Sequence, residues 1–321
     1  MSKLELKKCI GIDRCKYELK FKEEQKEITR VVKVISKYGH EFGEIQTERG
    51  KWMISLCLPK YFAEHNAVPF KMDKAKHFDD ITECVTNTIQ RHFKGPFKTT
   101  LSSIEMNITE VYKDCDYEKF FLLLSHSTLD DTKQNARYEI LDRRHGFRPI
   151  TTGIKTRMIK GRYFVKAYDK RRQLLSEYGA AIDYSPMRIE FVFSKLALTK
   201  YFGEQRNLNV IFSVAGLNVL INAYIETMND IIDNSINPYL GIIHMSMVEY
   251  MCKSKSIRDT YCAFKENVYD IEQLRLVLKD YYQINRQTDS SRKLISDLNK
   301  RFVIPKGTLH TLEQITKSLK M

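Results

Sequence analysis

Three segments of alternating polar and apolar residues decide the fold class of this chain: SSIEMNIT at 102–109, GRYFVKAYDKRRQ at 161–173 and MRIEFVFSK at 187–195. Successive side chains of a β-strand point to opposite faces, so each segment is expected to form a strand with one apolar and one polar face. In the first segment Ile104 and Met106 share one face, and Glu105 and Asn107 share the other. The pattern therefore predicts a sheet that gathers polar residues on one side.

The other two segments place a tyrosine and several charges on their polar faces. Lys166, Tyr168 and Lys170 share a face of the second segment, and Arg188 and Glu190 share a face of the third. Each strand thus offers polar groups two residues apart, which can point at one common position. Taken singly, such residues are more often a surface pair or the solvated face of a sheet.

The first two hundred residues read mainly as strands and the remainder mainly as helix. Further strands are expected at 15–22, 29–36, 52–58 and 149–157, helices at 77–93 and 116–126, and a hairpin turn at Lys160-Gly161. Later helices are expected at 207–233, 241–253, 256–266, 269–284, 289–300 and 308–320. The change near 202–207 predicts two domains, 1–205 and 206–321. The helices near 290–320 are compatible with a helix-turn-helix module, although two-helix turns are also common in bundles.

Two glutamates and an amide would offer hard oxygen ligands to a cation. If Glu105, Glu190 and Asn107 converge, they suit Mg²⁺ or Mn²⁺ rather than zinc. A tyrosine is a weak nucleophile at neutral pH because its unperturbed pKa is about 10. A metal ion on a phosphate, or a nearby Lys or Arg, would favour attack by Tyr168. Attack at phosphorus would leave a phosphotyrosine and a free 3′-hydroxyl, so the strand could later be rejoined.

The net charge indicates a polyanionic partner. The chain has 53 Lys and Arg against 40 Asp and Glu, a formal charge of +13, and each cation that neutralises a phosphate releases a counterion. A basic protein from a genome that over-uses lysine is the alternative explanation. The expected DNA-binding residues are Lys155, Arg157, Arg162, Lys166, Arg171 and Arg172. Phe147, Tyr163 and Phe164 lie among these cations and are candidates for stacking on unpaired bases.

Cysteine use and hydropathy predict a cytoplasmic protein. The seven cysteines are odd in number and include no CxxC pair, which argues against a disulfide framework and against a zinc knuckle. No run approaches the roughly 18 apolar residues of a membrane span, so no contact with a membrane is expected. The N-terminal residues have a basic start but no long apolar stretch, so no signal peptide is expected.

The three segments, taken in order, resemble the replication initiation proteins of phages and plasmids of the gene II/X type. These are rolling-circle Rep proteins and include those of filamentous phages. The family has a strand of the form S-R-I-D, a hairpin that ends in a Y-x-K segment, and a strand of the form R-F-E; the chain has SSIE, AYDK and MRIE. The resemblance extends over residues 50–205.

The resemblance assigns roles to five residues. It implies that Tyr168 is the nucleophile, that Lys170 and Arg188 assist it, and that Glu105 and Glu190 occupy the acidic positions of the family. It further implies metal-assisted nicking at an origin, a covalent 5′-phosphotyrosine intermediate and rejoining of the displaced circle. The partners implied are origin DNA, a host helicase and a host polymerase, and the protein could act as an oligomer.

The expected fold is α+β. We expect an antiparallel nickase sheet of the HUH/Rep-like kind, with about five strands, packed helices on its back and the site on its exposed face. A helical C-terminal region should follow.

The sequence also departs from the family. Ser103 stands where Arg is usual and Gln173 where Glu is common, and no His-hydrophobic-His pair occurs. Two other functions therefore stay open. One is a DNA-binding regulator without chemistry, in which Tyr168, Glu105 and Glu190 need not converge. The other is a conjugative relaxase, which would share the chemistry but have other partners.

Overall fold

The structure is a computed structural model of the chain. It describes residues 10–25, 31–66, 68–71, 76–111, 117, 121, 138–145, 148–156, 162–179, 182–231, 233, 237–254, 256–265, 267–268 and 271–285. The described residues form an α+β fold with an antiparallel sheet and several helices. They fall into two compact units, the first made of 1–111 and 156–227 and the second of 112–155 and 228–321.

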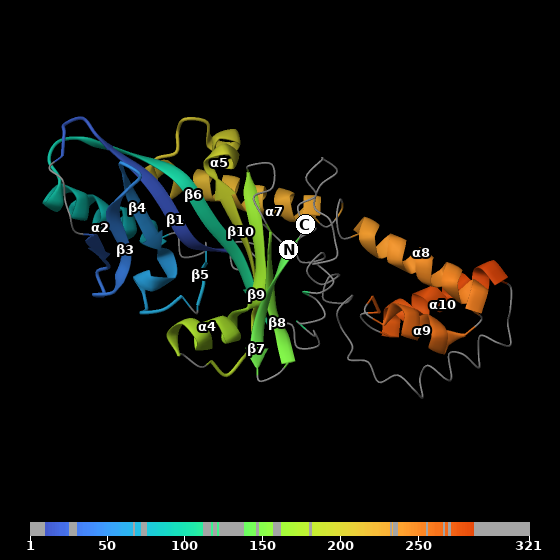
Figure 1. Cartoon of the computed structure of the whole chain (residues 1–321). Coiled ribbons are helices and arrows are strands. Elements are labelled where there is room, and N and C mark those ends of the chain that lie inside the picture. The colour runs from blue at the N-terminus through green and yellow to red at the C-terminus, as the bar shows by residue number, and fades with distance from the viewer. Residues whose placement is uncertain are drawn as a thin grey trace. The chain divides into compact units, whose positions relative to one another are not determined.

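An antiparallel sheet is the centre of the first unit (Figure 1). Its strands are β1 (Ile10–Phe21), β2 (Val32–Ile35), β3 (Glu41–Glu48), β4 (Lys51–Cys57), β5 (Phe70–Lys71), β6 (Phe97–Glu110), β9 (Tyr163–Asp169) and β10 (Met187–Ser194). Their order is β2-β3-β4-β1-β6-β10-β9, and β5 pairs with β1 beside β4. The expectation of about five strands was too low. It overlooked β3, whose sequence EFGEIQTE is too polar to show apolar alternation, and the two-residue β5.

One face of this sheet is the apolar core. It carries Ile104, Met106, Ile189 and Phe191, which are all buried. The helices that begin in this unit are α2 (Phe78–His92), α4 (Lys170–Tyr178), α5 (Lys195–Phe202), α6 (Leu208–Ile211) and α7 (Val214–Ile231). Tyr224 of α7 donates a hydrogen bond of 3.2 Å to the carbonyl oxygen of Ile189. This contact anchors α7 on the sheet.

The other face carries the polar residues and is covered in part. Asn66 and Lys170, the first residue of α4, lie over this face, because Asn66 is hydrogen-bonded to Arg188 and to Lys170. Asn66 ends the covering segment, residues 62–66, which follows the 3-10 helix η1 (Leu58–Tyr61). Helix α4 begins directly after β9, because Asp169 caps it by accepting a hydrogen bond of 3.2 Å from the Arg172 amide. Gly179 ends the helix in the left-handed conformation, with φ of 64°. Lys170 is therefore the first residue of a helix, where the sequence pattern had placed it on the strand.

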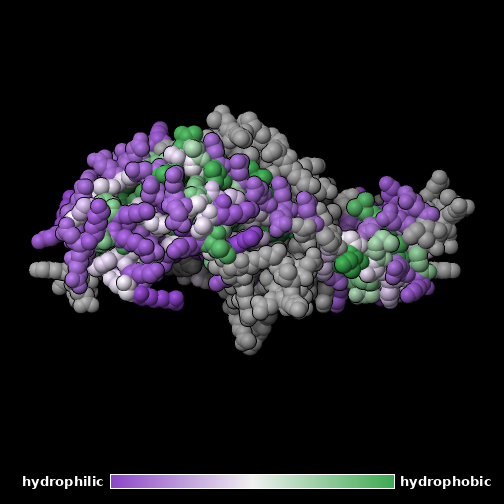
Figure 2. All heavy atoms as spheres, turned by 90° about the horizontal axis from the view of Figure 1, so that it is seen from above, coloured by the Kyte–Doolittle hydropathy of each residue, from purple (hydrophilic) through white to green (hydrophobic). Residues whose placement is uncertain are grey.

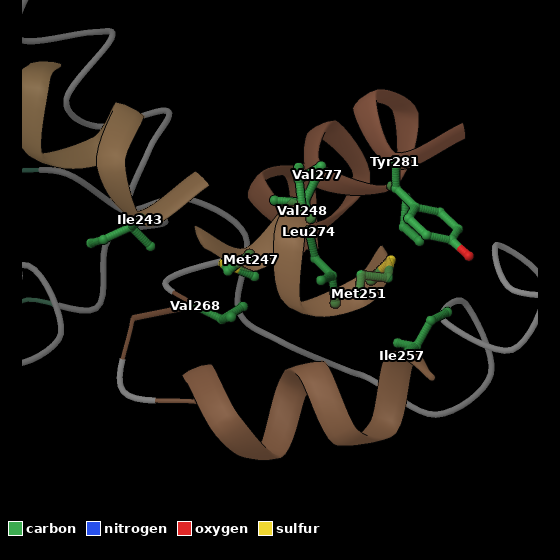
Figure 3. Close-up of a cluster of buried hydrophobic side chains, with 10 residues drawn as sticks. Ile243, Met247, Val248, Met251, Ile257, Val268, Leu274, Val277 and Tyr281 are labelled. Atoms are coloured by element: carbon green, nitrogen blue, oxygen red, sulfur yellow. The ribbon is translucent and has the colours of Figure 1, made fainter. Parts of the chain in front are cut away.

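The second unit contains β7 (Tyr138–His145), β8 (Arg148–Thr156), α8 (Asn237–Ser254), α9 (Ile257–Phe264) and α10 (Ile271–Asn285). The three helices enclose a core of their own (Figure 3). Met247 and Met251 of α8 meet Ile257 of α9 and Leu274 of α10 there. No helix in the described part of the chain is long and apolar enough to cross a membrane.

The two units divide the chain differently from the expected domains 1–205 and 206–321. Residues 206–227 belong to the sheet unit because their side chains complete its apolar core: Phe212 stacks on Phe78 of α2 with 4.5 Å between ring centroids. The expected helices at 289–300 and 308–320, and with them the helix-turn-helix module, lie outside the described residues, as does most of 116–126.

The surface seen in Figure 2 is largely hydrophilic over the described residues, with small separate apolar patches.

Candidate active site

Cross-strand pairing brings the predicted polar residues together. On the polar face, Glu190 of β10 lies opposite Asn107 of β6 on one side and Lys166 of β9 on the other. Two residues before Glu190 on β10, and on the same face, Arg188 lies opposite Tyr168 of β9. The three segments that were expected to aim polar side chains at one position therefore do so, because they are adjacent strands in register.

The phenol of Tyr168 is hydrogen-bonded to a carboxylate. Its hydroxyl donates to Oε1 of Glu190 at 2.5 Å, and Nη1 of Arg188 lies 3.8 Å from the same oxygen. Tyr168 is 9% exposed and Glu190 2%. The phenol, the carboxylate and the guanidinium thus form a tight group that is shielded from water.

Burial and charge set the protonation of this pair. Burial alone would raise the pKa of Glu190, but the cations Lys166 and Arg188 outweigh it and hold that pKa below its ordinary value. The pKa of Tyr168 is raised well above its ordinary value, first by burial and then by the negative charge of Glu190. At neutral pH the phenol is therefore protonated and the carboxylate is ionised. The neighbouring cations do not make Tyr168 a phenolate in the free protein, contrary to what the sequence suggested.

Arg188 is held by three fixed acceptors. Its Nε donates to Oγ1 of Thr109 at 2.8 Å, its Nη1 to Oδ2 of Asp13 at 3.1 Å, and its Nη2 to the carbonyl oxygen of Asn66 at 3.2 Å. The side chain is fully buried. The three hydrogen bonds fix the orientation of the guanidinium, and its positive charge is therefore held beside Glu190 and Tyr168.

Asp13 and Asn66 belong to the site although the sequence did not indicate them. Asp13 lies where the register of β1 against β6 shifts between Ile12 and Arg14, so the irregularity turns its carboxylate onto the polar face. An acid inside the apolar stretch IGID was a signal that could have revealed it. Asn66 donates to the same carboxylate at 3.3 Å. It comes from an irregular segment that shows no sequence pattern.

Lys170 supports this network rather than the phenol oxygen. Its Nζ donates to Oδ1 of Asn66 at 3.0 Å and to Oε1 of Gln173 at 2.7 Å. The same ammonium lies 5.9 Å from the centroid of the Tyr168 ring. Lys170 therefore ties the covering segment to α4. Gln173, which stands where the gene II/X family commonly has Glu, is its acceptor on that helix.

The two glutamates predicted as metal ligands hold a lysine between them. Nζ of Lys166 is 3.3 Å from Oε1 of Glu105 and 3.3 Å from Oε2 of Glu190. Within the described ranges, no group of three or more His, Cys, Asp and Glu side chains is arranged to hold a metal ion. The donor set therefore does not fit a divalent ion in this arrangement, because an ammonium group already bridges the carboxylates.

Asn107, the third predicted ligand, presents a donor instead of an acceptor. The Thr109 hydroxyl accepts from Arg188, so its own proton goes to Oδ1 of Asn107 at 3.1 Å. That bond orients the amide, and its Nδ2 is buried without a hydrogen-bond partner among the described residues. A buried donor without an acceptor is costly, and an anionic oxygen would satisfy it.

The predicted DNA-binding residues are distributed unevenly. Arg162, Arg171 and Arg172 of the first unit and Lys155 of the second are exposed, whereas Lys166 lies in the buried cluster. Arg157 and the aromatic Phe147 lie outside the described residues.

The two remaining aromatic candidates point to opposite faces of β9. Tyr163 packs against Phe191 and Phe193 on the apolar face, with centroids 6.1 and 6.3 Å away. The prediction that it stacks on bases is therefore not supported by its position. Phe164 lies on the polar face beside the ammonium of Lys166, which is 5.4 Å from its ring centroid.

A hollow of about 350 Å³ adjoins the cluster on the polar face. Arg14, Lys16, Glu48 and Lys60 line it, and Glu105 of the cluster is also part of its lining. The Lys16 ammonium binds Oε1 of Glu48 across it at 3.0 Å. The hollow gives the buried site a polar neighbourhood that is open to solvent.

Fold and site together define an α+β protein whose antiparallel sheet carries a tyrosine paired with a carboxylate and a guanidinium. None of the protein-family models and none of the curated proteins compared with the chain matches it. Among solved structures, the chain is similar to the one titled "Structure of Rolling Circle Replication Initiator Protein from Geobacillus stearothermophilus". The sequences are 10% identical, the match covers 66% of this chain and 80% of that one, and the TM-score is 0.34. A similarity this low carries no argument about the site, so the function must be argued from the geometry.

Proposed function

We propose that this chain nicks and rejoins single-stranded DNA through Tyr168, as the initiator of rolling-circle replication of a phage, a plasmid or an integrated element. The observation that carries the proposal is the hydrogen bond from the Tyr168 hydroxyl to Glu190, beside the buried charge of Arg188. A nucleophile bonded to an ionised base that is itself oriented by a third group is the arrangement that nucleophilic catalysis requires.

In the proposed step, the Tyr168 hydroxyl passes its proton to Glu190 as its oxygen attacks the scissile phosphorus. A bond forms between the phenol oxygen and phosphorus, and the bond from phosphorus to the 3′ oxygen breaks. The products are a 5′-phosphotyrosine and a 3′ oxygen that takes up a proton from solvent. Rejoining is the reverse: a 3′-hydroxyl loses its proton to solvent and attacks the phosphotyrosine, and Glu190 returns its proton to the departing phenol oxygen.

Two groups on the polar face suit the charge that builds up on the phosphoryl oxygens. Arg188 supplies a fixed positive charge, and Nδ2 of Asn107 supplies a donor that has no partner within the described part of the chain. Preorganised donors of this kind stabilise developing negative charge without reorganising. Because Tyr168 is largely buried, the phosphate reaches it only after part of the cover near Asn66 has moved.

The identification of the substrate as origin DNA rests on the resemblance of the three segments to the gene II/X family and on the positive charge. Arg162, Arg171 and Arg172 are exposed near the two ends of β9 and in α4, where they can neutralise phosphates of a bound strand. Recognition of a particular origin, and recruitment of a host helicase and polymerase, are parts of the same proposal. The Mg²⁺ or Mn²⁺ ion expected from the sequence does not fit carboxylates that a lysine already bridges, and no step above depends on it.

A covalent adduct tests the proposal. The full chain is incubated with labelled single-stranded oligonucleotides that tile the DNA around its own coding sequence, and a denaturing gel reveals any adduct. We expect one adduct with the wild-type chain and none with Tyr168→Phe, which keeps the ring and removes the nucleophilic oxygen. Tyr163→Phe is the matched control, because Tyr163 lies on the same strand but on the apolar face, and its adduct should persist.

Two outcomes would contradict the proposal. An adduct that survives Tyr168→Phe would show that another residue is the nucleophile. Tight binding of DNA by the wild-type chain, without any adduct or nick, would favour the regulator without chemistry.

A further inference from the structure

The Lys166 ammonium lies where a bridging cation of the site would lie. It is 3.3 Å from one oxygen of Glu105 and 3.3 Å from one oxygen of Glu190. The three residues come from three adjacent strands, β6, β10 and β9. A lysine on the neighbouring strand thus joins two carboxylates that are not otherwise bonded to each other.

The cluster has no surplus of negative charge. Three carboxylates, of Asp13, Glu105 and Glu190, face the cations of Lys166, Lys170 and Arg188. A fourth and more exposed cation, Arg14, lies 4.0 Å from Oε2 of Glu105. A divalent ion between the glutamates would add two positive charges within a few ångströms of Lys166 and Arg188, and like charges repel strongly at such distances. The ion could enter only if the lysine left.

Two of the remaining oxygens of the expected metal site accept hydrogen bonds, and the third, Oε2 of Glu105, lies 4.0 Å from Nε of Arg14. Oε1 of Glu190 accepts from Tyr168, and Oδ1 of Asn107 accepts from Thr109. Divalent magnesium requires a nearly octahedral set of oxygen ligands. The cluster has the hydrogen bonds of a lysine site and too few uncommitted oxygens for a metal site.

From these observations we propose that Lys166 is the resident cation of the site. It holds Glu105 and Glu190 in the position that a divalent metal ion would otherwise give them, and strand cleavage by this chain requires no divalent metal. Lys166 is a positioning residue, since it acts through the carboxylate that receives the tyrosine proton. The structural part of this proposal stands on the contacts of Lys166 alone, whereas the statement about cleavage rests on the proposed function.

Manganese binding tests the structural part without any substrate. Mn²⁺ is titrated into the full chain and the free ion is followed by electron paramagnetic resonance. We expect no saturable site in the wild-type chain and one site per chain in Lys166→Met, which removes the charge but keeps most of the length. The double variant with Lys166→Met and Glu190→Gln should lose that site again.

A second lysine on the same face provides the matched control. Lys16 binds Glu48 at 3.0 Å in the adjoining hollow, so Lys16→Met also releases a carboxylate. Among the described residues Lys16 bridges no second carboxylate there, and Glu48 is more exposed than Glu105 and Glu190. This variant should bind no Mn²⁺. Lys166→Arg, which keeps the positive charge, should bind none either, and circular dichroism verifies that each variant is folded.

The outcome can overturn the proposal in either direction. A saturable Mn²⁺ site in the wild-type chain that Glu105→Gln abolishes would show that the metal displaces the lysine. A folded Lys166→Met chain that binds no Mn²⁺ would show that the two carboxylates do not form a cation site. If that variant does not fold, the wild-type titration still decides the question.

Chelation tests the statement about cleavage. Adduct formation by the wild-type chain should be unchanged in excess EDTA after dialysis against the chelator. Loss of the adduct in EDTA and its return with Mg²⁺ would overturn the proposal while leaving the Tyr168 mechanism intact. Absence of an adduct under every condition would instead contradict the proposed function, and the manganese titration would still report on Lys166.

Discussion

At the scale of single residues, the reactivity that we propose for Tyr168 depends on Glu190. The pKa of the phenol is raised by burial and by the carboxylate, so the hydroxyl keeps its proton at neutral pH. The pKa of Glu190 is lowered because Lys166 and Arg188 outweigh its burial, so it is ready to accept that proton. The same environment that makes the tyrosine a poor acid thus keeps its base ionised.

Removing the base should slow the reaction far more than it weakens DNA binding. A positioned general base contributes typically about 10²- to 10⁴-fold to a rate. Glu190→Gln keeps the size and a hydrogen-bond acceptor but cannot take the proton, so the single-turnover rate of adduct formation should fall by that factor. Glu48→Gln, in the adjoining hollow, should leave the rate within about twofold of wild type. An unchanged rate in Glu190→Gln would exclude Glu190 as the base.

At the scale of elements, the step from β9 into α4 positions the residues around the tyrosine. Asp169 caps α4 through the Arg172 amide and also accepts from the Ser185 hydroxyl at 3.0 Å. The cap places Lys170 at the first helical position, from which it reaches Asn66. The two residues that follow Tyr168 therefore link it to its surroundings: Asp169 caps α4, and Lys170 binds the covering segment at Asn66.

Loss of this cap should affect both stability and chemistry. Asp169→Ala should lower the free energy of unfolding by about 1 kcal/mol, measured by urea denaturation, and should also slow adduct formation because Lys170 is displaced. Asn207→Ala removes the comparable cap of α6, where Asn207 accepts from the Val210 amide at 2.9 Å. That variant should show a similar loss of stability with an unchanged rate. Equal rates of adduct formation in the two variants would show that the cap of α4 does not contribute to the reaction.

At the scale of the whole molecule, the proposed function requires binding to DNA, and the surplus of 13 positive charges favours it. Charge alone attracts any polyanion, and only its distribution selects a path for a strand. Arg162 and Arg171 are exposed on the first unit, close in sequence to the two ends of the strand that bears Tyr168. We expect them to contribute more to binding than distant cations do.

The salt dependence of binding measures this contribution. Each phosphate contact to a single strand contributes about 0.7 to the slope of log K against log salt concentration. Replacing Arg162 and Arg171 by Ser should therefore reduce the slope for a single-stranded oligonucleotide by roughly 1.4. Replacing Lys33 and Lys37, which pair with Glu41 and Asp80, removes the same net charge and should change the slope little. Equal changes in the two double variants would show that only the net charge matters.

Much of the site was predictable from local patterns. Alternation identified β6, β9 and β10 and placed Glu105, Asn107, Tyr168, Arg188 and Glu190 on one face, where the structure finds them. The period of a strand determines which side chains share a face, so short segments were sufficient. The amphipathic spacing likewise located α2 to within one residue at each end.

Other features of the site depended on contacts between distant residues. Asp13 and Asn66 lie 175 and 122 positions from Arg188, and neither has a local pattern that marks it as its partner. The bridging role of Lys166 likewise requires the register of β9 against β10 and β6. The expectation that the site lies on an exposed face failed for the same reason, since the covering segment comes from residues that read as irregular.

The sequence by itself determined the class of the fold and the residues that share the polar face, because strand periodicity is a local property. The role of Tyr168 as nucleophile came from the resemblance of the three segments and belongs to the proposed function. Tertiary structure alone decided what surrounds that tyrosine. It paired the phenol with an ionised carboxylate, turned the amide of Asn107 into a donor and set an ammonium between two expected metal ligands. Protonation, orientation and cation choice depend on burial and on charges from distant strands, and these are fixed only when the chain folds.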